Sequence, residues 1–128
     1  MTQPLLKVDD LAVEFGSSAR AVRAVDGVSF SIEAGGAVGI VGESGSGKSV
    51  TALSILRLIP DPPGRVVRGR VEFNGVNLLE LPMSKMPDVR GRDIAMIFQE
   101  PMSSLNPLMT IGDQVGEALM LHASLEGE

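Results

Sequence analysis

One segment, GESGSGKS at residues 42–49, constrains the possible folds more than any other part of this sequence. It fits the pattern G-x-x-x-x-G-K-[ST] in full, and Gly45 adds a further glycine. The fixed positions of the pattern are Gly42, Gly47, Lys48 and Ser49. An apolar run at 37–42 precedes the loop, and apolar residues at helical spacing follow it from Lys48 to about Leu58. The order strand, glycine loop, helix is therefore expected.

The residue types in this loop suit the binding of a polyphosphate. Successive backbone N–H groups converge on an anion only in turns that most side chains forbid, and glycine permits those turns. The helix that follows adds its positive N-terminal end. We expect Lys48 to place an ammonium against the β and γ phosphates and the Ser49 hydroxyl to ligate Mg²⁺. The variable positions Glu43, Ser44 and Ser46 are expected to contribute backbone. The alternative is a flexible Gly/Ser turn with an incidental lysine.

The other segments predict an α/β fold with an antiparallel β element at its N-terminal side. Residues 5–15 and 21–32 alternate as half-buried strands do, and a Gly-Ser turn at 16–18 joins them. The continuous apolar runs at 37–42 and 93–99 suit strands buried on both faces, as in a parallel sheet. Residues 65–81 are expected to form short strands around an Asn74-Gly75 hairpin turn. Residues 83–92 are expected to form a short polar helix or loop. A helix is expected at 110–125, with Thr110 as its cap and Asp113 in its first turn.

Composition narrows the class of protein. With 128 residues, 44% of them hydrophobic, the chain can build the core of one domain or part of one. A net charge of −5 and only four aromatic residues, all Phe, disfavour a nucleic-acid partner. The absence of cysteine excludes disulfides and thiolate metal sites and permits a reducing cytoplasm. The apolar stretches are shorter than the roughly 20 residues that span a bilayer.

The segments that flank the loop resemble the ATP-binding subunits of ABC transporters, most closely those of bacterial oligopeptide, dipeptide and nickel importers. The resemblance runs from about Leu5 to Leu119 and is most specific in the blocks GESGSGKS and IFQEPMSSLNP. It implies an ABC-type P-loop NTPase core with ATP and Mg²⁺ as ligands. It also implies membrane subunits and a second ATP-binding subunit, in a homo- or heterodimer, as partners. Such a protein is cytoplasmic and peripheral on the inner face of the cell membrane, which it reaches only through its partner subunits.

The same resemblance assigns roles to two residues outside the loop. Gln99 stands at the Q-loop position, where the family's glutamine reaches Mg²⁺ and the attacking water, so Gln99 and Lys48 are the catalytic candidates. An amide suits this position because it ligates a metal without adding a titratable charge. Phe15 stands where the family has an aromatic side chain that stacks on adenine. The alternatives are a surface glutamine at a strand end and a core or edge aromatic of a strand.

The family's hydrolytic elements beyond the Q-loop do not occur within residues 1–128. These elements are an L-S-G-G-Q signature, a strand that ends in Asp-Glu and a switch histidine. The segment IAMIFQE ends in Gln99-Glu100 where Asp-Glu is needed, and its flanks place it at the Q-loop. We therefore expect the N-terminal part of one nucleotide-binding domain, incomplete at its C-terminal side, with the helical subdomain only begun from about residue 105. Such a chain is expected to be marginally stable or to associate.

Three functions are compatible with the sequence. The leading one is the ATPase subunit of a peptide- or nickel-class ABC importer, which couples ATP binding and hydrolysis to transport. The second is a truncated fragment that binds nucleotide and Mg²⁺ but cannot hydrolyse ATP alone. The third is an unrelated P-loop kinase or GTPase, for which a lid arginine or a guanine-reading Asn-Lys-x-Asp is expected, and neither occurs in this sequence.

Overall fold

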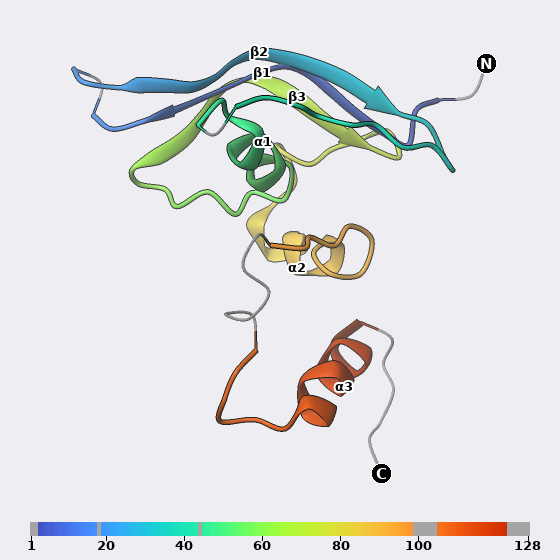
Figure 1. The fold of residues 1–128 in the computed structure, drawn as a ribbon. Coiled ribbons are helices and arrows are strands. Elements are labelled where there is room, and N and C mark those ends of the chain that lie inside the picture. Colours follow the sequence, from blue (N-terminus) through green and yellow to red (C-terminus); the bar gives the residue numbers. More distant parts are fainter. Residues whose placement is uncertain (1–2, 18, 44, 99–104, 123–128) are drawn as a thin grey trace. The chain divides into compact units, whose positions relative to one another are not determined.

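The computed structural model describes residues 3–17, 19–43, 45–98 and 105–122. Its elements are β1 (Leu6–Phe15), β2 (Val22–Ile32), α1 (Lys48–Ile55), β3 (Gly64–Phe73), β4 (Val76–Asn77), the 3₁₀ turn η1 (Met83–Lys85), α2 (Met86–Val89) and α3 (Ile111–His122). The chain divides into two compact units, Met1–Leu81 and Pro82–Glu128, and each is described by itself (Figure 1). The first unit holds the sheet and the glycine-rich loop.

Strands β1 and β2 form the antiparallel pair that the sequence predicts. Their register joins Leu6 to Ile32 at one end and Phe15 to Val22 at the other. Gly16 begins the connection with a φ of 104°, a conformation that glycine adopts without steric cost. The predicted antiparallel β element is therefore confirmed.

The hairpin predicted at Asn74-Gly75 is also confirmed. Asn74 has a φ of 50° and Gly75 a φ of 82°, as a type I′ turn requires at both central positions. Phe73 pairs with Val76 across this turn. Strand β3 is a single element of 10 residues and pairs antiparallel with β1, so the sheet has the order β2-β1-β3-β4.

A bulge centred on Asp10 bends β1 in the middle of the sheet. Asp10 has a φ of 51°, the register shifts between Val8 and Leu11, and the Asp10 N–H donates to the Ser29 hydroxyl at 2.8 Å. Gly69 on β3 faces the bulge with a φ of 111°. A Cβ at Gly69 would lie 2.6 Å from both the Asp10 carbonyl oxygen and the Leu11 Cα, so no other residue fits without displacing β1.

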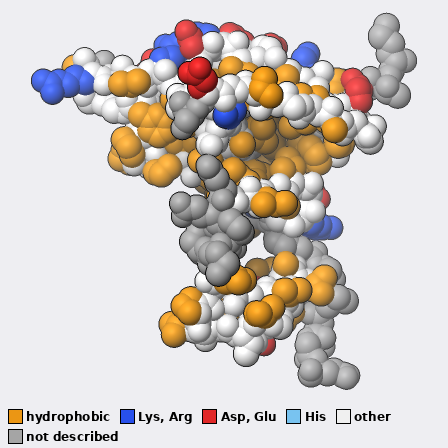
Figure 2. All heavy atoms as spheres, viewed as in Figure 1, with side chains coloured by type: hydrophobic (Ala, Val, Ile, Leu, Met, Phe, Trp, Pro, Cys, Tyr) orange, Lys and Arg blue, Asp and Glu red, His pale blue; other side chains and the backbone are white. Residues whose placement is uncertain are grey.

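The two faces of this sheet differ in polarity (Figure 2). On one face, arginines and carboxylates of neighbouring strands form ion pairs, among them Arg23 with Glu14 and Arg68 with Asp10, each at 2.7 Å. The other face lies against α1 (Figure 1), and hydrophobic side chains gather on that side (Figure 2). Its fully buried side chains are Val8, Leu11, Val13 and Val71. Alternation along the strands thus separates a solvated face from the core.

Helix α1 follows the glycine loop as predicted, although it ends at Ile55 rather than near Leu58. Arg57 has a φ of 55°, which takes the backbone out of the helix. The Arg57 guanidinium then donates to the carbonyl oxygens of Leu78 and Leu81, which fixes the end of the helix to the segment after β4. The C-terminal end of the helix is therefore tied to the segment that follows the sheet.

The second unit contains η1, α2 and α3. The short helix or loop predicted at 83–92 is present as η1 and α2, but its Met86 and Val89 side chains are buried, so it is not polar throughout. The Thr110 hydroxyl accepts a hydrogen bond from the Asp113 N–H at 3.1 Å, which confirms the predicted helix cap. Residues 123–125 of the predicted helix lie outside the described part. None of the helices described is both long and apolar enough to cross a membrane.

Two predicted buried strands are not strands in the described part of the chain. Residues 37–42 and 95–98 have no regular structure, and the second run contributes only an isolated bridge between Arg90 and Ile94. Val41 is 94% exposed and Ile97 is 95% exposed. A strand buried on both faces needs neighbours to pair its backbone and cover its side chains, and the four-stranded antiparallel sheet provides none for either run. The predicted parallel sheet is therefore absent from the described residues.

Replacing Gly69 with alanine should destabilise the sheet unit. The new Cβ meets β1 backbone at 2.6 Å while the residue keeps a φ of 111°, so we expect a loss of more than about 2 kcal/mol in the free energy of unfolding. Gly39→Ala is the matched control, because a Cβ there meets nothing within 4 Å. Urea denaturation of both variants measures the difference. Equal stability of the two would contradict the close approach of β3 to β1.

The stability of the sheet should fall in acid, in part through Glu14. The hydrogen bond from Arg23 lowers the pKa of Glu14 below its ordinary value of 4.5. Stabilisation from this carboxylate is therefore complete above about pH 4.5 and is lost as the pH falls through the lowered value. Glu14→Gln should flatten this part of the pH dependence, as measured by the urea midpoint between about pH 6 and about pH 3.

The control for this measurement is Glu33→Gln. Glu33 is exposed and takes part in none of the ion pairs found among the described residues. Its replacement should leave the acid limb of the stability profile unchanged. The interpretation is wrong if Glu33→Gln flattens the profile as much as Glu14→Gln does.

Candidate phosphate-binding loop

The described residues of the glycine loop, 42–43 and 45–47, form a bend that connects the exposed run 37–41 to the start of α1. The Ser46 N–H donates to the Glu43 carbonyl oxygen at 3.1 Å, which closes a turn. Gly42 lies so near the far side of this turn that a Cβ on it would be 2.6 Å from the Ser46 hydroxyl oxygen. The loop therefore curls back on itself, as a cradle for an anion must.

Two glycines provide the backbone conformations of the bend. Gly45 has a φ of 83° and Gly47 a φ of 102°, both in the region that side chains disfavour. A Cβ on Gly45 would meet nothing within 4 Å, so conformation alone requires glycine there. A Cβ on Gly47 would lie 2.6 Å from the Ala24 carbonyl oxygen on β2, so Gly47 is needed for conformation and for space.

The N-terminal end of α1 is open toward the loop. Gly47 is the N-cap, no side chain among the described residues caps the helix there, and its first turn holds no acidic residue. The first N–H groups of a helix have no acceptor within the helix and carry the positive end of its dipole. Thr51 is buried and donates both its N–H and its hydroxyl to the Gly47 carbonyl, at 2.9 and 2.8 Å. The first turn is thus held in place while its end stays available to an anion.

Lys48 folds back over the loop. Its ammonium donates to the Gly42 carbonyl oxygen, and its Cδ would lie 3.7 Å from a Cβ on Gly42. The side chain is half-buried, whereas Ser49 on the next position of α1 is exposed. The positive charge of Lys48 therefore lies beside the Gly42 carbonyl, close to the N-terminal end of α1.

These features fit a polyphosphate with a divalent cation. The bend offers backbone N–H groups, a helix end and an ammonium, all of which attract negative charge. Ser49 offers a single hydroxyl, and no cluster of three or more metal-ligating side chains occurs among the described residues. A Mg²⁺ ion here would take Ser49 as one ligand and complete its shell with phosphate oxygens and water.

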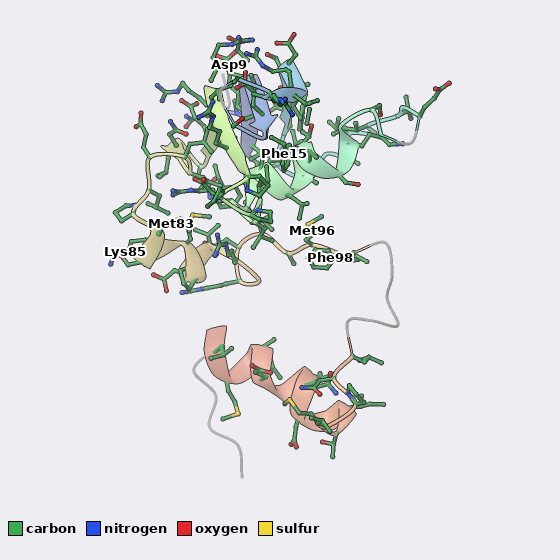
Figure 3. All side chains as sticks on the ribbon, turned by 90° about the vertical axis from the view of Figure 1, so that its left-hand side faces the viewer. Asp9, Phe15, Met83, Lys85, Met96 and Phe98 are labelled. Carbon is green, nitrogen blue, oxygen red and sulfur yellow. The ribbon has the colours of Figure 1, made fainter. Side chains whose placement is uncertain are left out.

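The other predicted site residues are placed less completely. Phe15 lies at the end of β1 and is half-buried (Figure 3). A Cβ on Gly64 of β3 would lie 2.7 Å from its ring, so packing at the strand end accounts for its position, and its role toward adenine stays a prediction. Ser44 and Gln99 lie outside the described residues.

Sequence reasoning did not identify the part of the sheet that contacts the loop. The Ala24 backbone and the Val25 side chain on β2 both lie against Gly47, with Val25 Cγ2 at 3.5 Å from a Cβ built there. Alternation predicts a strand at 21–32, but no signal in the sequence says which strand approaches the glycine loop.

The family model described as "ABC transporter" matches residues 25–126. The chain belongs to the ABC transporter family. It is 54% identical over 126 residues to the peptidoglycan transport ATP-binding protein YejF of Agrobacterium fabrum, 48% over 124 residues to the oligopeptide transport ATP-binding protein OppD of Bacillus subtilis, and 51% over 118 residues to the dipeptide transport ATP-binding protein DppD of Escherichia coli. The predicted resemblance to ATP-binding subunits of ABC transporters is therefore confirmed.

These alignments cover most of this ABC family chain but little of its relatives. They include 98%, 97% and 92% of the chain and 23%, 35% and 36% of the three relatives. The chain thus spans between somewhat less than a quarter and somewhat more than a third of the length of these curated relatives. The part of the family that this chain matches includes the glycine loop at 42–49.

Proposed function

We propose that this chain is the ATP- and Mg²⁺-binding part of the ATPase subunit of an ABC importer of the peptide or nickel class. The observation that carries the proposal is the bend at 42–49, with Lys48 folded over it beside the open end of α1. Family membership and the names of the relatives, which describe peptidoglycan, oligopeptide and dipeptide transport, support the class and favour peptides over nickel.

In this proposal, the phosphates are held mainly by backbone. The N–H groups of Gly45, Gly47, Lys48 and Ser49 would donate to phosphate oxygens, while the Ser46 N–H keeps the loop closed through its bond to the Glu43 carbonyl. Glu43, Ser44 and Ser46 would serve through their backbone. The Lys48 ammonium exchanges the Gly42 carbonyl for oxygens of the β and γ phosphates. Ser49 contributes its hydroxyl to Mg²⁺. ATP bound in this way supplies the phosphoanhydride bond whose hydrolysis drives the transport cycle.

Two further residues complete the proposed site. Phe15 would offer a ring face to adenine from the end of β1, and Gln99 would contact Mg²⁺ and orient the attacking water. For Phe15, the stacking role requires that part of the ring stay accessible, and its half-buried position beside Gly64 permits this. Gln99 lies outside the described residues, so its role rests on the family resemblance alone.

The proposed partners are the membrane subunits of the importer and a second ATP-binding subunit, in a homo- or heterodimer. The chain would then work in the cytoplasm, peripheral on the inner face of the membrane. A nucleic-acid partner is not proposed, since the arginines on the outer face of the sheet are paired with carboxylates. These pairs join Arg23 to Glu14 and Asp26, Arg65 to Glu14, Arg68 to Asp10 and Asp26, and Arg70 to Glu72.

A second candidate function is nucleotide binding without hydrolysis. The residues of the phosphate cradle lie together within 42–49, whereas the sequence 1–128 contains no L-S-G-G-Q signature and no strand ending in Asp-Glu. Without a carboxylate to orient the water, hydrolysis by these residues alone would be slow. Phosphate release by the 128-residue chain, with and without partner subunits, separates the two functions: release by the isolated chain would exclude the second.

Replacing Lys48 with alanine should weaken nucleotide binding by at least about tenfold, because a charged hydrogen-bond donor to the phosphates is lost. Titration of the full chain with a non-hydrolysable ATP analogue and Mg²⁺ measures the affinity. Lys7→Ala on β1 is the control, since it removes the same charge from an exposed position away from the bend. Equal affinity of both variants and the unmodified chain would exclude the proposed cradle.

Replacing Ser49 with alanine should reduce affinity only when Mg²⁺ is present. The hydroxyl is proposed to act through the metal, so the gain in analogue affinity on adding Mg²⁺ should shrink by about tenfold while affinity in a chelator stays unchanged. Ser31→Ala, at an exposed serine of β2, serves as the control. A loss of the same size with and without Mg²⁺ would show that Ser49 acts on the loop and not on the metal.

A further inference from the structure

Gly47 is where the glycine loop meets the sheet. Among the loop's glycines, Gly45 has nothing within 4 Å of a built Cβ, and Gly42 faces only Ser46 and Lys48 of the same loop. A Cβ built on Gly47, by contrast, would lie 2.6 Å from the Ala24 carbonyl oxygen and 3.5 Å from the Val25 Cγ2. Both belong to β2, which therefore forms a wall behind the start of α1.

The part of β2 behind Gly47 is held in place because Val25 packs in the core of the sheet. Val25 is 4% exposed and pairs with Val13 on β1, which is fully buried and pairs in turn with Val66 on β3. On the other side, Thr51 holds the first turn of α1 to the Gly47 carbonyl through two hydrogen bonds. A displacement of Gly47 would therefore move the helix end and its N–H groups with it.

We propose that Val25 is a positioning residue for the phosphate-binding loop. Its side chain, together with the Ala24 carbonyl, confines Gly47 and so sets the direction in which the N–H groups at the start of α1 point. The residue contacts the loop and not the ligand. The part of the inference that concerns affinity rests on the proposed nucleotide function, whereas the part that concerns loop order does not.

The geometry explains why a smaller side chain should matter. Removing the Val25 methyl groups leaves a gap on one side of Gly47, and packed surroundings relax only partly into such a gap. Because Gly47 already has a glycine's conformational freedom, the loop would then sample orientations in which its N–H groups no longer converge. Binding would carry the cost of ordering the loop again.

The test compares Val25→Ala with Val71→Ala in the full chain. Val71 is a fully buried valine of the same sheet, but it lies on β3, which is separated from β2 by β1. Amide hydrogen exchange at 45–49 in the absence of nucleotide should accelerate at least about tenfold in Val25→Ala and by less than about twofold in Val71→Ala. Affinity for an ATP analogue should fall about tenfold in Val25→Ala alone.

Each outcome separates the inference from the proposed function. Equal exchange at 45–49 in the two variants would overturn the role of Val25, whatever the affinities are. Failure of the unmodified chain to bind the analogue would overturn the nucleotide function, while the exchange result would still decide whether Val25 orders the loop. If Val25→Ala does not fold, Val25→Cys in reducing buffer replaces it. Its exchange at 45–49 should still be faster than in Val71→Ala, by a smaller factor than is expected for Val25→Ala.

Discussion

The close contact between Gly47 and β2 is the interaction on which the candidate site depends. The described part of the loop also has bonds within itself and with α1, such as those of Ser46 to Glu43 and of Thr51 to Gly47. Among the described glycines of the bend, Gly47 is the one whose built Cβ meets the sheet, at 2.6 Å from the Ala24 carbonyl oxygen. A side chain at Gly47 would separate the two, which gives the fixed glycine of the motif a packing role as well as a conformational one.

The sheet can support the loop because one of its faces is solvated and charged and the other forms the apolar core. Ion pairs such as Arg68 with Asp10 cross neighbouring strands on the solvated face, where each pair contributes little on its own. Burial of Leu11, Val13 and Val71 on the other face supplies the larger share of stability. Helix α1 lies against that apolar face, and Val25 behind the glycine loop is buried on the same side.

Local signals in the sequence predicted most of what the structure confirms. The Asn74-Gly75 turn, the Thr110 cap and the loop before α1 each depend on a few adjacent residues, and each is present. The apolar runs at 37–42 and 93–99 were predicted as strands, but a strand exists only with a partner, and none of the described strands pairs with either run. The contact of Val25 with Gly47 could not be predicted either, because it joins segments whose proximity is set by the folded sheet.

The position of Lys48 determines how the loop can respond to a ligand. Its bond to the Gly42 carbonyl gives the ammonium a partner within the loop when no phosphate is near. Several phosphate oxygens around one ammonium can replace that partner with charge-assisted hydrogen bonds. In the proposed function, a phosphate that takes the place of the carbonyl would be held by Lys48 and the open end of α1 together.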